Sequence, residues 1–266
     1  MLLLCLLSSC DNASKTEIIN ENPTQWLLPS KLREASGLVV ADQRSVYIHN
    51  DEIGEIYQFN IKNGSVIKLA SISWPPVKED FEGIAVTPLS IYLMTSNGEL
   101  FEIKNITADK ARQVVGARRI DTGLENNCEF EGLHHLDNQL LMPCKEDLQQ
   151  PGDGRFRVFA FDITSESITE FLSLDIGQIG GINRMAATAF EATARHYYIV
   201  TEDHLVRIDR TTLQSDSFRL NAKLHRQGEG IAIFPNGNII LVEDNRRGLA
   251  RLTRYNNLEE LESVNR

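Results

Sequence analysis

The sequence predicts an all-β fold, a β-propeller of five blades with four antiparallel strands each. Three observations predict it. A short phrase recurs along the 266 residues, each copy is followed by runs with the composition of strands, and the one unit that lacks a fourth strand is matched by a spare strand near the N-terminus. Four antiparallel strands repeated at about 46 residues are typical of a propeller.

The recurring phrase is a carboxylate followed by glycine and an aliphatic residue. It reads DFEGIAV from Asp80, EFEGLHH from Glu129 and QGEGIAI from Gln227, with a looser copy, REASGLVV, from Arg33. The glycines of these four copies lie 46, 49 and 98 residues apart. Because the last interval is twice 49, we expect one more copy midway. INRMAATAF stands there, and equal spacing assigns Arg184 to its glutamate position and Met185 to its glycine position.

Each unit reads as a short apolar strand after the phrase, a second strand rich in Ile, Leu, Tyr and Val, a third that alternates, and a weaker fourth. The second strands begin at Ser45, Ser90, Gln139, His196 and Asn238. The fifth unit has a poor fourth strand after Tyr255. QWLLPS, from Gln25, occupies the place of a fourth strand just ahead of a phrase. We expect it to complete the last blade and close the ring, which leaves no open edge.

Two sets of polar side chains are expected at one mouth of the central channel. The first strand of each blade lines the channel, and the second runs antiparallel to it, so its end lies at the same face. The first set is Ser36, Glu82, Glu131, Arg184 and Glu229. The second set is Asn50, Asp51, Asn97, Lys145, Glu146, Glu202, Asp203, Glu243 and Asp244.

Carboxylates crowded in a channel raise one another's pKa, and a bound cation relieves the repulsion. Oxygen ligands without a His or Cys cluster favour Ca²⁺, with Mg²⁺ or Mn²⁺ behind it. The predicted ligands are Glu82, Glu131, Glu229 and Asp51. Two alternatives stay open. The glutamates accept backbone N–H groups between blades or pair with Arg33, Lys145 and Arg184, or they bind an organic cation directly.

The N-terminus, MLLLCLLSSC, resembles a bacterial lipobox in which Cys10 is lipidated. We therefore expect a signal peptide at residues 1–10, a polar tether at 11–24 and the propeller at 25–266, held in the cell envelope and facing the periplasm, at either membrane. Disulfides persist there. Cys128 and Cys144 flank neighbouring strands of the third blade at the same end, so a disulfide is expected, with two buried thiols as the alternative.

Composition excludes some classes of function. The formal net charge is -10, which argues against nucleic acid as a general partner because phosphate binding needs concentrated Lys and Arg. The motifs of serine hydrolases, zinc proteases and phosphate-binding loops are absent from the sequence.

The segments GEGIAIFPNGNIILVEDN, NCEFEGLHHLDNQLLMPCKED and REASGLVVADQRSVYIHND resemble the SdiA-regulated family and the related esterase-like phytase-domain proteins. The resemblance covers most of the chain after about residue 25. It implies a bacterial envelope propeller with an acidic, calcium-binding mouth, in which Glu82, Glu131 and Glu229 hold the Glu-Gly positions and Asp51 the acidic position of the HND segment. Arg184 departs from that pattern, and the family names do not establish an activity.

Two functions follow as hypotheses. The first is a lipoprotein, anchored to the membrane, whose mouth holds Ca²⁺ and recognises a small molecule or an envelope protein. The second is a metal-dependent hydrolase of a phosphoester, ester or lactone. His49 is the better candidate for a general base if it reaches the mouth, and no catalytic residue is assigned.

Overall fold

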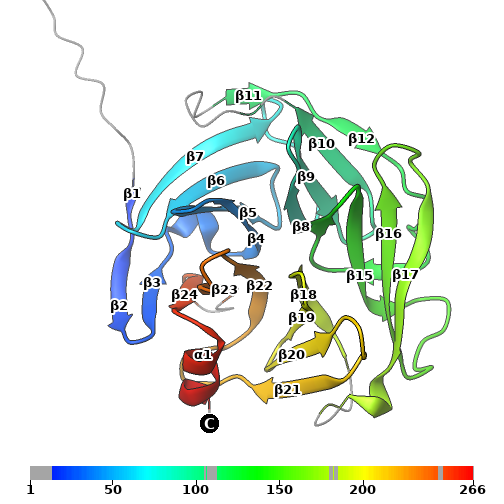
Figure 1. Cartoon of the computed structure of the whole chain (residues 1–266). Helices are drawn as coiled ribbons and strands as arrows, with labels where there is room; N and C mark the ends of the chain where they lie inside the picture. Colours follow the sequence, from blue (N-terminus) through cyan, green and yellow to red (C-terminus); the bar gives the residue numbers. More distant parts are fainter. Residues whose placement is uncertain are drawn as a thin grey trace, which may run out of the picture.

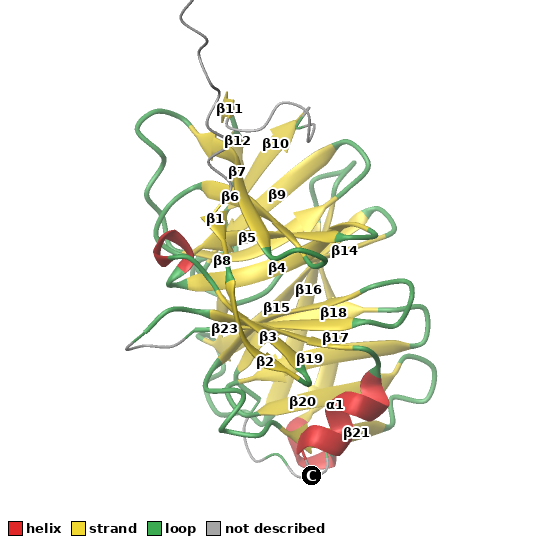
Figure 2. Cartoon of the chain, turned by 90° about the vertical axis from the view of Figure 1, so that its left-hand side faces the viewer, coloured by secondary structure: helices red, strands yellow, loops and turns green. Residues whose placement is uncertain are grey.

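Five sheets, each built on four antiparallel strands and three of them with added strands, stand around a common axis, as the sequence predicts (Figure 1). The computed structural model describes residues 14–104, 106, 113–179, 182, 185–244 and 248–265. Seen from the side, the described chain is built almost wholly from strands, and the helix α1 (Leu258–Asn265) packs beside β21 (Figure 2). Within these residues no helix is long and apolar enough to cross a membrane.

The strands follow one another blade by blade. Blade 1 holds β4 (Ala35–Asp42), β5 (Ser45–Asn50), β6 (Glu55–Asn60) and β7 (Ser65–Ile72), with β11 (Gln113–Val115) added to β7. Blade 2 holds β8 (Phe81–Val86), β9 (Ser90–Thr95), β10 (Leu100–Lys104) and β12 (Arg118–Ile120). Blade 3 holds β13 (Cys128–Phe130) and β14 (His134–Leu136), which share β15 (Gln139–Asp147), then β16 (Arg155–Asp162) and β17 (Ile168–Asp175). Blade 4 holds β18 (Ala187–Ala192), β19 (His196–Thr201), β20 (His204–Asp209) and β21 (Ser215–Arg219). Blade 5 holds β22 (Gly228–Ile233), β23 (Ile239–Glu243), β24 (Arg251–Tyr255) and β3 (Thr24–Leu27), with β2 (Glu17–Glu21) outside it. Short 3₁₀ turns lie at Ser30–Leu32 and Ile176–Gln178.

The second strands of the blades read as continuous apolar runs because each is covered on both faces by neighbouring blades. Every residue of β9 and of β23 is buried. Outer strands such as β21 (SDSFR) are half exposed and more polar. This is the burial pattern expected where sheets pack face to face, with water reaching only the rim.

The ring is closed by β3, which pairs antiparallel with β24. Trp26 on β3 is 3% exposed and stands edge-on to Phe59 of blade 1, with ring centroids 5.3 Å apart. Blade 5 is therefore joined to blade 1 through both backbone pairing and core packing, and the prediction for QWLLPS is confirmed.

Residues 14–21 fall within the segment expected to be a polar tether, and here they pair with the propeller. β1 (Ser14–Lys15) lies along β7 of blade 1, and β2 lies along β3 of blade 5. The described part of this segment thus pairs with both blades that meet where the ring closes.

Close backbone approach explains the repeated glycine. A Cβ atom built on Gly83 would lie 2.9 Å from the carbonyl carbon of Gly132. One built on Gly132 would lie 2.9 Å from Cα of Ala189. Gly132 also has φ of +83°, which favours glycine. The inner strands touch backbone to backbone around the axis, as the sequence led us to expect.

The same contacts correct the fourth copy of the repeat. Thr188 and Ala189 hold its carboxylate and glycine positions, not Arg184 and Met185. Ala189 packs around the axis with the glycines of the other blades, whereas Met185 is buried in the core between blades 3 and 4. Arg184 lies outside the described residues. Equal spacing failed because the interval from Glu131 to Thr188 is 57 residues and that from Thr188 to Glu229 is 41.

Candidate functional site

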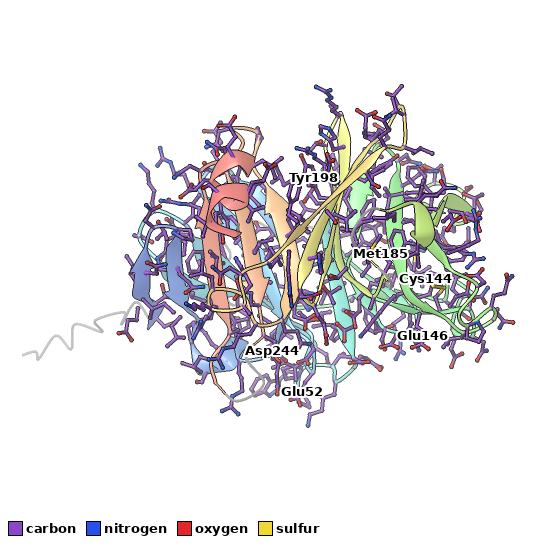
Figure 3. The ribbon with its side chains drawn as sticks, turned by 90° about the horizontal axis from the view of Figure 1, so that it is seen from below. Glu52, Cys144, Glu146, Met185, Tyr198 and Asp244 are labelled. Carbon is purple, nitrogen blue, oxygen red and sulfur yellow. A yellow bond between two sulfur atoms is a disulfide. The ribbon has the colours of Figure 1, made fainter. Side chains whose placement is uncertain are left out.

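A β-bulge aims one side chain of each of four blades at the axis. On β4, β8, β18 and β22 the register shifts by one residue against the neighbouring strand, and the unpaired residues are Ser36, Glu82, Thr188 and Glu229. A bulge bends its strand and redirects the extra side chain. The side chains at this equivalent position therefore gather at one end of the axis, on the face where Glu52, Glu146 and Asp244 lie in Figure 3.

Blade 3 uses a different device. Its inner strand is interrupted between β13 and β14, and Glu131 sits in the gap with its N–H donating to Pro143 at 3.3 Å. The register shift between β13 and β15 leaves Lys145 as the extra residue. This blade therefore sends two side chains of opposite charge, Glu131 and Lys145, toward the axis.

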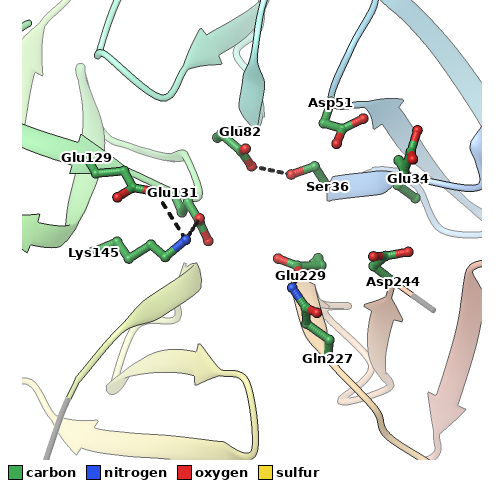
Figure 4. Close-up of a pocket in the computed structure, with 11 residues that line it drawn as sticks. Glu34, Ser36, Asp51, Glu82, Glu129, Glu131, Lys145, Gln227, Glu229 and Asp244 are labelled. Carbon is green, nitrogen blue, oxygen red and sulfur yellow. Dashed lines mark hydrogen bonds and ion pairs between the residues drawn. The ribbon is translucent and has the colours of Figure 1, made fainter. Parts of the chain in front are cut away.

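Of these residues, all but Thr188 line an acidic cavity of about 230 Å³, hereafter the mouth (Figure 4). Thr188 lines the cavity beside it. Its lining is Glu34, Ala35, Ser36, Asp51, Glu82, Glu129, Glu131, Lys145, Gln227, Glu229 and Asp244. Directly along the axis the space shrinks to about 10 Å³, walled by the glycines and aliphatic residues of the inner strands. The mouth is thus a blind pocket, open on one face, and its described residues contribute seven carboxylates and a single ammonium group.

Hydrogen bonds satisfy only part of this polar lining. Ser36 donates to Glu82, and Gln227 Nε2 donates to Glu229. Lys145 Nζ donates to Glu131 and to Glu129 Oε1, the latter at 3.2 Å. Oε2 of Glu131 and Oδ1 of Asp51 are buried atoms without a hydrogen-bond partner. Buried oxygens of this kind are costly to leave unsatisfied.

The carboxyl groups hold their protons unusually tightly. Burial, followed by repulsion from Glu131, raises the pKa of Glu229 to about 9 and that of Glu82 to about 8. Burial and the charge of Glu34 raise the pKa of Asp51 to about 7. Burial also raises the pKa of Glu131 despite its ion pair with Lys145. Glu82 and Glu229 therefore keep their protons at neutral pH while no cation is bound, and a cation that binds them must displace those protons.

The donor set of the mouth fits a hard cation, because it consists of carboxylate, hydroxyl and amide oxygens. The distances between these oxygens are longer than those between the ligand atoms of a bound ion. Among the described residues, the one group of three His, Cys, Asp or Glu with ligand atoms within 4.8 Å of one another is Cys128, Cys144 and Asp147. Those two sulfurs are joined in a disulfide, with Cα atoms 5.5 Å apart. A cation in the mouth would draw mutually repelling carboxylates inward.

The structure brings together part of the predicted site. Seven of the predicted residues line the mouth: Ser36, Asp51, Glu82, Glu131, Lys145, Glu229 and Asp244. Glu202 and Asp203 line a separate cavity of about 300 Å³ that shares Lys145 and Gln227 with the mouth. Glu146 is exposed and lines neither cavity. Arg184 and Cys10 lie outside the described residues.

Three predicted mouth residues turn away from it. Asn50 is buried and accepts the N–H of Glu52, and Asn97 accepts the hydroxyl of Thr95. Glu243 is 1% exposed and binds His225 and Thr253 inside blade 5. Side chains alternate along a strand, so Glu243 and Asp244 cannot both face the mouth.

Three polar mouth residues were missed from the sequence: Glu34, Glu129 and Gln227. Each lies two positions before a residue that was predicted, namely Ser36, Glu131 and Glu229. Residues two apart on an extended strand share a face. That period of two, applied to the repeated phrase, was the signal that could have found them.

Comparison with known proteins supports the fold. No protein-family model matches the chain, and no curated protein sequence matches it. The PQQ-bound aldose sugar dehydrogenase from Streptomyces coelicolor is 12% identical with a TM-score of 0.54, over 91% of this chain and 98% of that one. A gluconolactonase from Xanthomonas campestris is 8% identical with a TM-score of 0.55, over 92% and 96%. At such identities the likeness shows a shared β-propeller fold.

Proposed function

We propose that the mouth binds a hard divalent cation, Ca²⁺ before Mg²⁺ or Mn²⁺, and through it an oxygen-rich ligand or an envelope partner. One observation carries the proposal. In the described part of the chain, a blind pocket gathers seven carboxylates around a single ammonium group, and burial and mutual repulsion raise the pKa of Asp51, Glu82 and Glu229 to about 7, 8 and 9. A cation relieves the repulsion that produces these shifts.

Glu82, Glu229 and Asp51 are the residues that would hold the cation, with Ser36 as a neutral neighbour and Glu131 at the far side. The unpartnered Oδ1 of Asp51 supports this assignment. A bound divalent cation supplies a positive centre to which carboxylate, phosphate or hydroxyl groups of a ligand coordinate. The chain's own part is to orient that centre toward the open face and to exclude bulk water from the closed end.

The test is direct. Metal content of the purified protein, followed by calorimetric titration with Ca²⁺ after EDTA treatment, should show a bound cation. Glu82→Gln together with Glu229→Gln should abolish it. Glu146→Gln is the matched control, because Glu146 is exposed on the same face and does not line the mouth. No heat of binding in the unmodified protein would reject the calcium proposal.

A second candidate, a hydrolase of a phosphoester, ester or lactone, is favoured by the pKa of about 8 at Glu82. A carboxyl group that stays protonated at neutral pH can donate a proton to a leaving group. The fold is compatible, since a gluconolactonase shares it. His49 is not the base. It is fully buried beneath Gly37, and burial lowers its pKa to about 4. Turnover of generic ester, lactone and phosphoester substrates that Glu82→Gln abolishes would establish this reading; equal rates in both would reject it.

We also propose that Cys10 carries a lipid anchor in the bacterial envelope, in line with the resemblance to the SdiA-regulated family. Because β1 begins at Ser14, the extended chain between Cys10 and Ser14 spans at most about 14 Å. A propeller anchored in this way is held against the membrane by its rim at blades 1 and 5. Fractionation of cells expressing Cys10→Ala should find the protein released from the membrane, and unchanged membrane association would reject the anchor.

A further inference from the structure

Lys145 is the one cationic side chain that lines the mouth among the residues the structure describes. Its ammonium group pairs with Glu131 and, at 3.2 Å, with Glu129. Figure 4 shows these three residues on one side of the mouth. Glu82, Asp51, Glu34, Glu229 and Asp244 surround the other side. The acidic lining is therefore divided into a half that already contains a positive charge and a half that contains none.

We propose that Lys145 is a built-in cation that fills one of two cation positions in the mouth. The protein then takes a single exchangeable cation, on the side of blades 1, 2 and 5, and a neutral side chain at position 145 opens a second position between Glu129 and Glu131. The inference rests on the proposed cation-binding function and adds the number and place of the cations.

The local fold holds Lys145 in this place. It is the extra residue of the bulge between β13 and β15, so its side chain is directed away from the strand pairing and into the mouth. The residue before it, Cys144, is cross-linked to Cys128, which directly precedes Glu129. Lys145 and Glu129 thus each directly follow a cysteine of the disulfide. A pair fixed so closely at its backbone loses little conformational entropy on forming.

The positive charge of Lys145 is also needed by its second partner, Glu131. Glu131 is 5% exposed, and its Oε2 has no hydrogen-bond partner even with Lys145 present. Hydrogen bonds and charges from Glu131 and Glu129 raise the pKa of Lys145 against the opposing effect of burial, so its charge persists at neutral pH. Without the ammonium group, a nearly buried carboxylate would lose its partner, which is strongly unfavourable. Carboxylate oxygens left in this state are suitable ligands for Ca²⁺, with water completing the shell.

The experiment counts cations. Calorimetric titration with Ca²⁺ is made on the unmodified protein, Lys145→Met and Lys145→Arg, each after EDTA treatment. We expect one Ca²⁺ per chain in the unmodified protein and in Lys145→Arg, and two in Lys145→Met. Adding Glu129→Gln to Lys145→Met should return the count to one. Lys145→Gln, whose amide still donates to Glu131, replaces Lys145→Met if that variant does not fold, with the same expected count.

Lys78→Met separates site-specific from long-range effects. Lys78 is exposed, does not line the mouth, and forms a backbone β-bridge with Ile53, two residues beyond Asp51. Lys78→Met therefore removes the same charge from the same face without changing the lining of the mouth. A count of one in both Lys145→Met and Lys78→Met, with a similar gain in affinity, overturns the inference and leaves the cation-binding function intact. Binding by Lys145→Met alone overturns the inference, which assigns one exchangeable cation to the natural protein, and also rejects Ca²⁺ binding by that protein. Binding by neither rejects both.

Discussion

Glu229→Gln is expected to stabilise the cation-free protein, although it removes a charged group from a polar pocket. The side chain is 8% exposed at the closed end of the mouth, and its carboxyl pKa is raised to about 9. Glutamine keeps the shape of the side chain and a carbonyl oxygen to accept the amide of Gln227. It removes the group that must either bind a proton or lie ionised beside Glu131 and Glu82.

The magnitude follows from proton linkage. An acid whose pKa is higher in the folded state stabilises the fold fully below its unfolded pKa, and that contribution is lost as pH rises toward the folded value. At pH 7.5 the group is ionised in the unfolded chain, near a pKa of 4.5, and protonated in the folded chain. Three pH units at 1.36 kcal/mol each give an upper limit of about 4 kcal/mol. Rearrangement of the pocket around an ionised Glu229 keeps the value below this limit, so we expect about 2 kcal/mol, or roughly 4–8 °C in Tm.

The assay is urea unfolding in EDTA at pH 7.5 and pH 4.5. Glu229→Gln should be more stable than the natural protein at pH 7.5 and within about 0.5 kcal/mol of it at pH 4.5, where most of the linkage has vanished. Glu146→Gln, an exposed change on the same face, should match the natural protein at both pH values. Added Ca²⁺ should stabilise the natural protein and have little effect on Glu229→Gln. A variant that is less stable than the natural protein at pH 7.5 would refute the reasoning.

Three further predictions concern the scaffold, each checked by urea unfolding. Replacing Cys128 and Cys144 together with Ser should lower the free energy of unfolding by about 3 kcal/mol, because the bond joins cysteines 16 residues apart and so restricts the unfolded chain; an unchanged midpoint would contradict this. Gly132→Ala should cost more than about 2 kcal/mol beyond Gly123→Ala, since both glycines have positive φ but only Gly132 faces neighbouring backbone, and equal losses would show that close approach is unimportant. Trp26→Ala should cost about 3–5 kcal/mol by opening the closure of the ring, whereas Trp74→Ala, at a residue 75% exposed, should cost almost nothing, so comparable losses would argue against closure by β3.

The blades were predictable because their signals are local. Alternation and runs of Ile, Val and Tyr mark strands within a few residues, and the repeated phrase marks where each blade begins. The missing fourth strand after Tyr255 and the spare QWLLPS were enough to close the ring, since an unpaired edge is unfavourable. β3 and β24 pair as this argument requires.

The fourth copy of the phrase was placed wrongly because the prediction assumed blades of equal length, and two neighbouring blades differ from the average length. The chain between Glu131 and Thr188 is longer than a standard unit, and the next unit is shorter by a similar amount. Thr188 and Ala189 carry neither a carboxylate nor a glycine, so composition could not identify them. Only the register of β18 against β19, with Thr188 unpaired, shows that they are equivalent to Glu82 and Gly83.

By itself the sequence determined an acidic five-bladed propeller and placed Ser36, Glu82, Glu131 and Glu229 at one mouth, because strand periodicity and a repeated phrase are written in neighbouring residues. The tertiary structure decided which other side chains join them. Bulges, and the backbone contacts that glycines permit, turned Lys145 into the mouth, Thr188 into the cavity beside it and Glu243 away from both. The raised pKa of Glu229 likewise depends on burial and on carboxylates of other blades, distances that no stretch of sequence contains.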